Sequence, residues 1–349
     1  DKITTISLLN SKKTNYLPIK KNIAIPNLRK IKEEAIKTKG LNIDTYSQRF
    51  YPYEETCSQL IGYVDYNGEG RSGVELELNN LLKGVEKEEI FIKTIDSKSE
   101  NKEKEKYNHD LRGNDVYLTI DIELQKILYE EIYNGQVNSS AKSANGILVN
   151  PFNGEILAIA GTPSFNPNNY KNYKIESFKN NVISNQYEPG STIKVIPILT
   201  VFQDINSNDI SYINCENGEY EIPNTSRIIH DHNPHKELTV DEILIYSSNI
   251  GITKISDLIG KYQTYKSLRK FGIGTKTGIE LPGEEAGELR ELDSWTKLSH
   301  LMVNMGQEFS VTNIQLCMIY ASIANGGYLL KPQIIKEIVT INNKIFSQV

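Results

Sequence analysis

Residues 188–202 read EPGSTIKVIPILTVF. Pro189 and Gly190 interrupt the preceding loop, and the apolar run that follows predicts a buried helix with Ser191 in its first turn. Pro197 lacks a backbone donor inside that run, so we expect a local kink there. Residues three apart lie on one face of a helix, which should bring the Ser191 hydroxyl beside the Lys194 amine.

This spacing suits nucleophilic catalysis. A serine hydroxyl is a weak nucleophile, but a buried lysine with a lowered pKa can take its proton. The unpaired N–H groups at a helix start favour negative charge nearby. Ser191 is therefore a candidate nucleophile and Lys194 a candidate general base. The alternative is a serine N-cap with a surface lysine one turn later, and Ser-x-x-Lys taken alone favours that alternative because it is common by chance.

A second motif lies downstream, where Ser247-Ser248-Asn249 follows the apolar stretch VDEILIY. Ser-x-x-Lys with a later Ser-x-Asn is the motif pair of penicillin-binding proteins and serine β-lactamases. In this interpretation Ser247 relays a proton between Lys194 and the leaving amine, and Asn249 donates to a carbonyl of the bound peptide. The alternative is a polar turn between two helices.

Composition sets wide bounds on the function. The chain has 349 residues and a net charge of −5, which argues against a general nucleic-acid binder. Cys57, Cys215 and Cys317 form no CxxC pair, so we expect no zinc site. No apolar run approaches the roughly 20 residues of a membrane span. The first residue is Asp1 rather than Met, so we expect a membrane anchor upstream of it in the native protein.

The pattern of elements predicts a mixed α+β fold. We expect a strand at 114–121, an amphipathic helix through Leu124 and Ile132, a hairpin at 144–161, and mainly helices to about Ala324. Such an order predicts an antiparallel sheet covered by helices. In the first 108 residues, we expect Asn27 to cap a helix and 90–96 to form a strand. The polar run 97–108 should be a solvated linker between two domains.

At this point the chain resembles the class B penicillin-binding proteins, the monofunctional peptidoglycan D,D-transpeptidases, with the septal, cell-division branch most similar and the elongation branch next. The likeness covers most of the chain. Its segments come in the family's order, and they are RFYPYEETCSQLIGYV (49–64), GRSGVELELNNLLKG (70–84), DVYLTIDIELQ (115–125), GILVNPFNGEILAIAGTPSFNPNNY (146–170), EPGSTIK, SSNIG, FGIGTKTGIELPGE (271–284), MGQEFSVTNIQL (305–316) and ANGGYLLKPQII (324–335).

The resemblance implies an irregular, non-catalytic α/β pedestal of the dimerisation type with its linker at 1–108, and a transpeptidase domain at 109–349. Ser191 would attack the penultimate D-Ala carbonyl of a stem peptide, and an amine on a neighbouring stem peptide would complete the cross-link. β-Lactams would acylate the same serine, and no metal or cofactor is implied. The protein would sit in the cell membrane, with its catalytic domain on the outer face at the division septum, beside a lipid-carrier-dependent glycosyltransferase and division proteins.

The sequence departs from the family at its third motif, Lys-Thr-Gly, which lies on a strand lining the cleft. TKTG at 275–278 has the right letters, but it follows Asn249 too soon and lies in a segment that the family keeps away from the active site. We therefore expect the transpeptidase domain to be C-terminally incomplete in this chain, with the third motif on a continuation of the native protein. The alternative is a protein that ends here and is inactive because it has lost that motif. A second departure is Glu308, where relatives usually have glycine.

Two other function classes stay open. A catalytically silent scaffold would keep the fold without the third motif, and a β-lactamase or antibiotic sensor would have no use for the pedestal. The run HDHNPH (230–235) suggests metal ligands, but we expect a solvated loop there. Trp295 is expected to be a packing residue.

Overall fold

The structure is a computed structural model that describes residue 31 and residues 48–84, 113–204, 212–340 and 345–346. Arg49–Val349 forms one compact unit of the chain. The predicted strand at 90–96 and the polar run at 97–108 lie outside the described residues. So does the predicted helix after Asn27, except for Ile31, which is helical.

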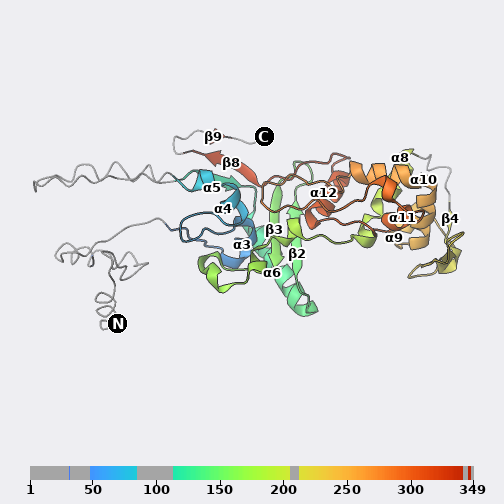
Figure 1. The fold of residues 1–349 in the computed structure, drawn as a ribbon, viewed down its shortest axis with the longest axis horizontal. Coiled ribbons are helices and arrows are strands. Elements are labelled where there is room, and N and C mark those ends of the chain that lie inside the picture. The colour runs from blue at the N-terminus through green and yellow to red at the C-terminus, as the bar shows by residue number, and fades with distance from the viewer. Residues whose placement is uncertain (1–30, 32–47, 85–112, 205–211, 341–344, 347–349) are drawn as a thin grey trace, which may run out of the picture. The chain divides into compact units, whose positions relative to one another are not determined.

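An antiparallel hairpin lies at the centre of this unit (Figure 1). It consists of β2 (Ala144–Val149) and β3 (Ile156–Thr162), which confirms the hairpin predicted at 144–161. Gly154 closes the turn with φ +78°, a backbone conformation that glycine adopts without strain. The helix α6 (Ile122–Ser139) packs along both strands, and α12 (Asn313–Ala324) packs on β2. β3 is almost wholly buried because its neighbours cover it.

A second antiparallel sheet adjoins the hairpin. It is formed by β1 (Asp115–Leu118), β8 (Ile335–Val339) and β9 (Ile345–Phe346). β1 confirms the strand predicted near 114–121. Backbone bonds connect the two sheets, because the N–H of Ile156 in β3 donates to Gln333 O at 2.9 Å and the N–H of Asp121, just after β1, donates to Leu157 O in β3 at 2.9 Å.

Helices dominate the rest of the described chain, as predicted. They surround a hydrophobic cluster that includes Val201, Ile243 and Ile252. Within the described ranges, none of the helices is both long and apolar enough to cross a membrane. The elements are α7 (Asn181–Ser184), α8 (Val195–Asp204), α9 (Val240–Ile245), α10 (Asn249–Lys270), α11 (Ser299–Asn304), the short strands β4 (Ile213–Asn214), β5 (Glu219–Glu221), β6 (Ile228–His230) and β7 (Glu237–Leu238), and the 3-10 turns η2 (Pro167–Asn172), η3 (Ile175–Phe178), η4 (Gly190–Ile193), η6 (Glu216–Gly218) and η7 (Leu292–Ser294).

The segment 49–84 packs into the same core as the central hairpin. Leu60 and Val74 belong to one hydrophobic cluster with Ile159 of β3. Buried Gln125 of α6 donates to Thr56 O at 2.7 Å and to Ile159 O at 2.9 Å, and it accepts from the N–H of Ile159 at 2.8 Å. One side chain thus ties this segment to α6 and β3. The segment contains η1 (Glu54–Cys57), α3 (Ser58–Ile61), α4 (Gly73–Glu77) and α5 (Asn79–Leu82).

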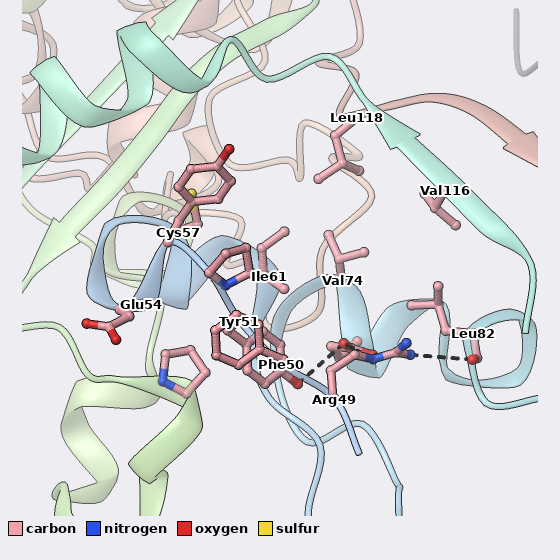
Figure 2. Close-up of a pocket in the computed structure, with 14 residues that line it drawn as sticks. Arg49, Phe50, Tyr51, Glu54, Cys57, Ile61, Val74, Leu82, Val116 and Leu118 are labelled. Atoms are coloured by element: carbon pink, nitrogen blue, oxygen red, sulfur yellow. Dashed lines mark hydrogen bonds and ion pairs between the residues drawn. The ribbon is translucent and has the colours of Figure 1, made fainter. Parts of the chain in front are cut away.

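A largely apolar cavity of about 340 Å³ lies between this segment and β1 (Figure 2). Val116 and Leu118 of β1 form one side, and the tyrosine-rich stretch at 49–54 forms the other. Arg49 bridges the segment, with Nε 2.7 Å from Glu75 and Nη2 3.4 Å from Leu82 O. Ser191 and Lys194 do not line this cavity.

We expect Gln125→Leu to destabilise the fold by about 2–4 kcal/mol, because the substitution leaves a buried N–H and two carbonyls without their partner. Gln136→Leu is the matched control. Gln136 lies on the same helix, and its bond to Lys142 O is exposed, so a change within about 0.5 kcal/mol is expected. Urea unfolding of both variants measures the difference, and equal shifts would contradict the role given to Gln125.

Candidate active site

Ser191 lies on an exposed turn that leads into a buried helix. Gly190–Ile193 form the 3-10 turn η4, and α8 begins at Val195. The sequence predicted one helix with a kink at Pro197. Instead, the helical geometry changes at Lys194, and Pro197 lies in the first turn of α8. A missing N–H costs little there, because first-turn N–H groups have no intrahelical partner.

Contacts from a neighbouring loop hold this turn. The N–H of Gly190 donates to Gly306 O at 3.0 Å, and a Glu188 carboxylate oxygen accepts from the N–H of Glu308 at 2.9 Å. Gly306 has φ +84°, and a Cβ there would lie 2.0 Å from Gly190 O. No side chain larger than hydrogen fits at Gly306 while the turn stays where it is. The loop therefore sets the position of Ser191.

Lys194 is fully buried and points toward the Ser-x-Asn motif. Its Nζ donates to Ser247 O at 2.6 Å, to Ser247 Oγ at 3.1 Å and to Asn249 Oδ1 at 2.7 Å. The structure thus brings three of the four predicted site residues into direct contact. The fourth, Ser191, is three residues before Lys194 at the exposed start of the turn.

Burial changes the acidity of this lysine. Removal from water lowers the pKa of Lys194 from 10.5 to about 8, and the nearby Asp231 carboxylate opposes that effect by attraction. A lysine with such a pKa is partly neutral near physiological pH, so it can accept a proton.

The Ser-x-Asn motif lies at a sharp junction between two helices. α9 begins with a capping box between Thr239 and Glu242, and α10 begins at Asn249 after the N-cap Ser248. Ser247, between the helices, has φ +54°, a left-handed conformation that is uncommon for serine. This conformation accompanies the approach of both its carbonyl and its hydroxyl to Lys194. Strained backbone of this kind is often found at functional sites.

Sequence reasoning missed Asp231. Its carboxylate accepts from Ser248 Oγ at 2.6 Å, from the N–H of Asn249 at 2.6 Å and from the N–H of Ile250 at 3.0 Å. The adjacent His230 carbonyl accepts from Asn249 Nδ2 at 3.0 Å. Most of the run HDHNPH is exposed, as expected for a solvated loop, but Asp231 and the His230 carbonyl also support the motif. No local signal pointed to Asp231, because it is distant in sequence from the helix that it caps.

The histidines in that run do not converge. His235 bonds to Asn233 O at 2.9 Å through Nδ1 and stacks on Tyr246, with ring centroids 4.6 Å apart. Across the part of the chain that the structure describes, no group of three or more His, Cys, Asp or Glu residues is arranged to hold a metal ion.

The TKTG run lies on a loop rather than on a strand. The backbone N–H and the hydroxyl of Thr277 both donate to Glu284, each at 2.6 Å. This local role agrees with the expectation that the run is not the third motif. The other departure, Glu308, has φ +62° and forms an ion pair with Arg290.

Trp295 is buried in a hydrophobic cluster, and its indole N–H donates to Arg290 O at 3.0 Å. This confirms its predicted packing role.

Open space borders the Ser191 turn. A cavity of about 400 Å³ is lined by Thr192, by residues of β2 including Asn145 and Ile147, and by residues of α12 including Cys317 and Tyr320. Among the described strands, β2 pairs only with β3. The other edge of β2 therefore faces this space beside the candidate nucleophile.

Comparison with protein families gives two matches. Residues 145–348 match the penicillin binding protein transpeptidase domain, and residues 2–118 match the penicillin-binding protein dimerisation domain.

Individual relatives agree with these matches. The chain is 30% identical over 336 residues to a peptidoglycan D,D-transpeptidase FtsI homolog of Mesostigma viride, covering 88% of this chain and 55% of the relative. It is 30% identical over 301 residues to peptidoglycan D,D-transpeptidase FtsI of Escherichia coli K12, covering 84% and 49%. The chain thus spans about half the length of these curated relatives.

Solved structures show the same fold. The apo form of penicillin binding protein 3 from Mycobacterium tuberculosis is 26% identical, with a TM-score of 0.73, covering 86% of this chain and 64% of that one. That protein has also been solved in complex with aztreonam and with ampicillin. With its α+β fold and its Ser-x-x-Lys and Ser-x-Asn motifs in one site, the chain belongs to the penicillin-binding protein transpeptidase family and carries that family's dimerisation domain ahead of the transpeptidase domain.

Proposed function

We propose that this chain is part of a peptidoglycan D,D-transpeptidase that cross-links stem peptides through an acyl-enzyme on Ser191, and that β-lactams acylate the same serine. The observation that carries the proposal is the buried Lys194 amine, three residues after the exposed Ser191, which has a lowered pKa and contacts Ser247 and Asn249. The names of the relatives and the β-lactam complexes of the mycobacterial protein support the reaction class.

The contacts of Lys194 suggest how its proton moves. An ammonium has three N–H donors, and three acceptors surround this one. The carbonyl of Ser247 and the amide oxygen of Asn249 can only accept. The Ser247 hydroxyl can instead turn and donate to a neutral amine. Ser247 is therefore the partner through which Lys194 can exchange a proton.

In the proposed reaction, Ser191 Oγ attacks the penultimate D-Ala carbonyl carbon while its proton passes to neutral Lys194. The tetrahedral intermediate then expels the terminal D-Ala, whose amine nitrogen takes the proton from Lys194 through Ser247. The Asn249 amide orients the peptide. An amine of a second stem peptide finally attacks the acyl-enzyme carbonyl and gives its proton to neutral Lys194, which passes that proton to Ser191 Oγ as the ester bond breaks and the cross-link forms. No metal or cofactor is needed in these steps.

The wider setting is also proposed. We assign 1–108 to a non-catalytic domain with its linker and 109–349 to the transpeptidase domain. The relatives named FtsI favour a septal role over an elongation role. We propose a membrane-anchored protein that is active on the outer face of the membrane, with a lipid-carrier-dependent glycosyltransferase and division proteins as partners.

Incubation of the 349-residue chain with penicillin should add the mass of one penicillin, and Ser191→Ala should abolish the adduct, because only an activated serine opens the β-lactam ring. Intact-mass spectrometry measures both. If neither this chain nor the native polypeptide that contains it forms the adduct, the protein is a silent scaffold and the enzyme proposal fails. An adduct only on the longer polypeptide would show that the third motif lies outside this chain. Rapid release of the adduct would indicate a β-lactamase.

Acylation should accelerate as pH rises toward about 8. Only neutral Lys194 can take the proton, and its fraction grows about tenfold per pH unit below its pKa. Stopped-flow or quenched measurements of the second-order acylation rate between pH 5.5 and 9.5 give the profile. The unfolding midpoint, measured over the same range, controls for loss of fold. A flat profile in a folded protein would exclude Lys194 as the base.

Gly306→Ala should displace the nucleophile turn, which is η4 (Gly190–Ile193) with Ser191, because the new methyl group would clash with Gly190 O. We expect an acylation rate lower by about 10²-fold and a loss of stability of about 2–4 kcal/mol. Gly326→Ala is the matched control, since Gly326 has φ +88° with no heavy atom within 4 Å of an added Cβ. It carries the same backbone strain, about 1–2 kcal/mol, without the clash. Equal acylation rates in the two variants would show that the contact with Gly306 does not position Ser191.

A further inference from the structure

We propose that Asp231 is a positioning residue for the reaction at Ser191, and that its carboxylate fixes the start of α10 so that the Ser247–Asn249 motif holds the Lys194 amine in place. This inference rests on the proposed function, because it concerns the same site. It extends the site to a side chain that lies outside both sequence motifs.

The contacts of Asp231 converge on the motif. One carboxylate oxygen accepts from the N–H groups of Asn249 and Ile250, at 2.6 and 3.0 Å, and the other accepts from Ser248 Oγ at 2.6 Å. Ser248 Oγ in turn accepts from the N–H of Gly251 at 2.8 Å. The hydrogen-bonded side chains of Asp231 and Ser248 thus provide acceptors for three N–H groups in the first turn of α10. A carboxylate at this end of a helix is also favoured by the helix dipole.

Asp231 is itself held by a short hairpin. β5 and β6 pair antiparallel, with Glu219 opposite His230, and Asp231 follows β6 directly. The N–H of Asp231 donates to Gly218 O at 3.1 Å, and the side chain of Ile229 is buried in the helical core. The hairpin therefore presents the carboxylate to α10 from outside the helix. Lys194 Nζ lies 2.7 Å from the Asn249 amide oxygen. The position of Asn249 at the start of α10 therefore also affects the position of the Lys194 amine.

The charge of Asp231 has a second effect. The groups that contact Lys194 Nζ, from the Ser247 turn and from α10, are neutral. Asp231 is the charged group that acts on the pKa of Lys194 among the described residues, and it raises that pKa against the effect of burial. A residue that served only the stability of α10 would leave the titration of Lys194 unchanged. This difference separates a positioning role in the site from a purely structural one.

Two variants and one control test the inference. Asp231→Asn keeps the size and the acceptor oxygen for the two N–H groups but removes the charge. Its acylation profile should keep a similar plateau, and its rise should move to lower pH. Asp231→Ala removes every contact and should slow acylation by about 10²-fold at all pH values. Asp121→Ala is the control, because Asp121 caps α6 by accepting from the N–H groups of Glu123 and Leu124. It loses a helix cap of the same kind but should acylate at the parent rate.

Direct measurement of the Lys194 titration by NMR makes the test independent of activity. The pKa of Lys194 should fall in Asp231→Asn and stay unchanged in Asp121→Ala. Amide hydrogen exchange at Asn249 and Ile250 should speed up in Asp231→Ala. If neither this chain nor the native polypeptide that contains it forms an acyl-enzyme, the proposed function fails, and these two readouts still decide the role of Asp231. Parent-like titration, exchange and acylation in both Asp231 variants would overturn the inference.

Discussion

The candidate site depends on one constraint, the burial of a lysine ammonium. A charged amine out of water is costly unless each of its N–H groups has an acceptor. Lys194 has three acceptors, and all of them come from the Ser247 turn and the first residue of α10. The nucleophile turn and the Ser-x-Asn motif are therefore coupled, because a shift of either one would leave part of a buried charge unsatisfied.

That coupling explains several local features. Ser247 adopts a left-handed backbone conformation where both its carbonyl and its hydroxyl contact Lys194. Asn249 uses its amide oxygen for Lys194 and its amide nitrogen for the His230 carbonyl, so its orientation is fixed from both ends. The amide oxygen and nitrogen of Asn249, the Ser248 hydroxyl and the Asp231 carboxylate all have hydrogen-bond partners. Fully satisfied networks of this kind hold a single geometry, whereas partly satisfied ones are costly.

The sequence predicted the parts of the structure that depend on local patterns. The Asn-Pro-Phe-Asn-Gly turn between two apolar runs is sufficient to predict the β2–β3 hairpin, and the serine and lysine spacing is sufficient to nominate the site. What it could not predict depends on contacts between distant segments. Asp231 caps a helix that begins 18 residues later, and Gln125 joins α6 to the segment around Thr56. Neither contact leaves a periodic or spaced signal. The lowered pKa of Lys194 likewise follows from burial, which the whole fold creates.

The change from a 3-10 turn to an α-helix at Lys194 gives the two central residues opposite environments. In a 3-10 helix, residues three apart lie almost in line along the axis. Ser191 and Lys194 are three residues apart, yet Ser191 is exposed and Lys194 has no exposed surface. Lys194 directly precedes the buried helix α8, and its long side chain runs into the interior to contact Ser247 and Asn249, while Ser191 stays exposed. A substrate can then approach the hydroxyl from solvent while the amine stays dry enough to keep its lowered pKa. Because the helix type changes within the short Ser-x-x-Lys spacing, the two residues can have these different environments.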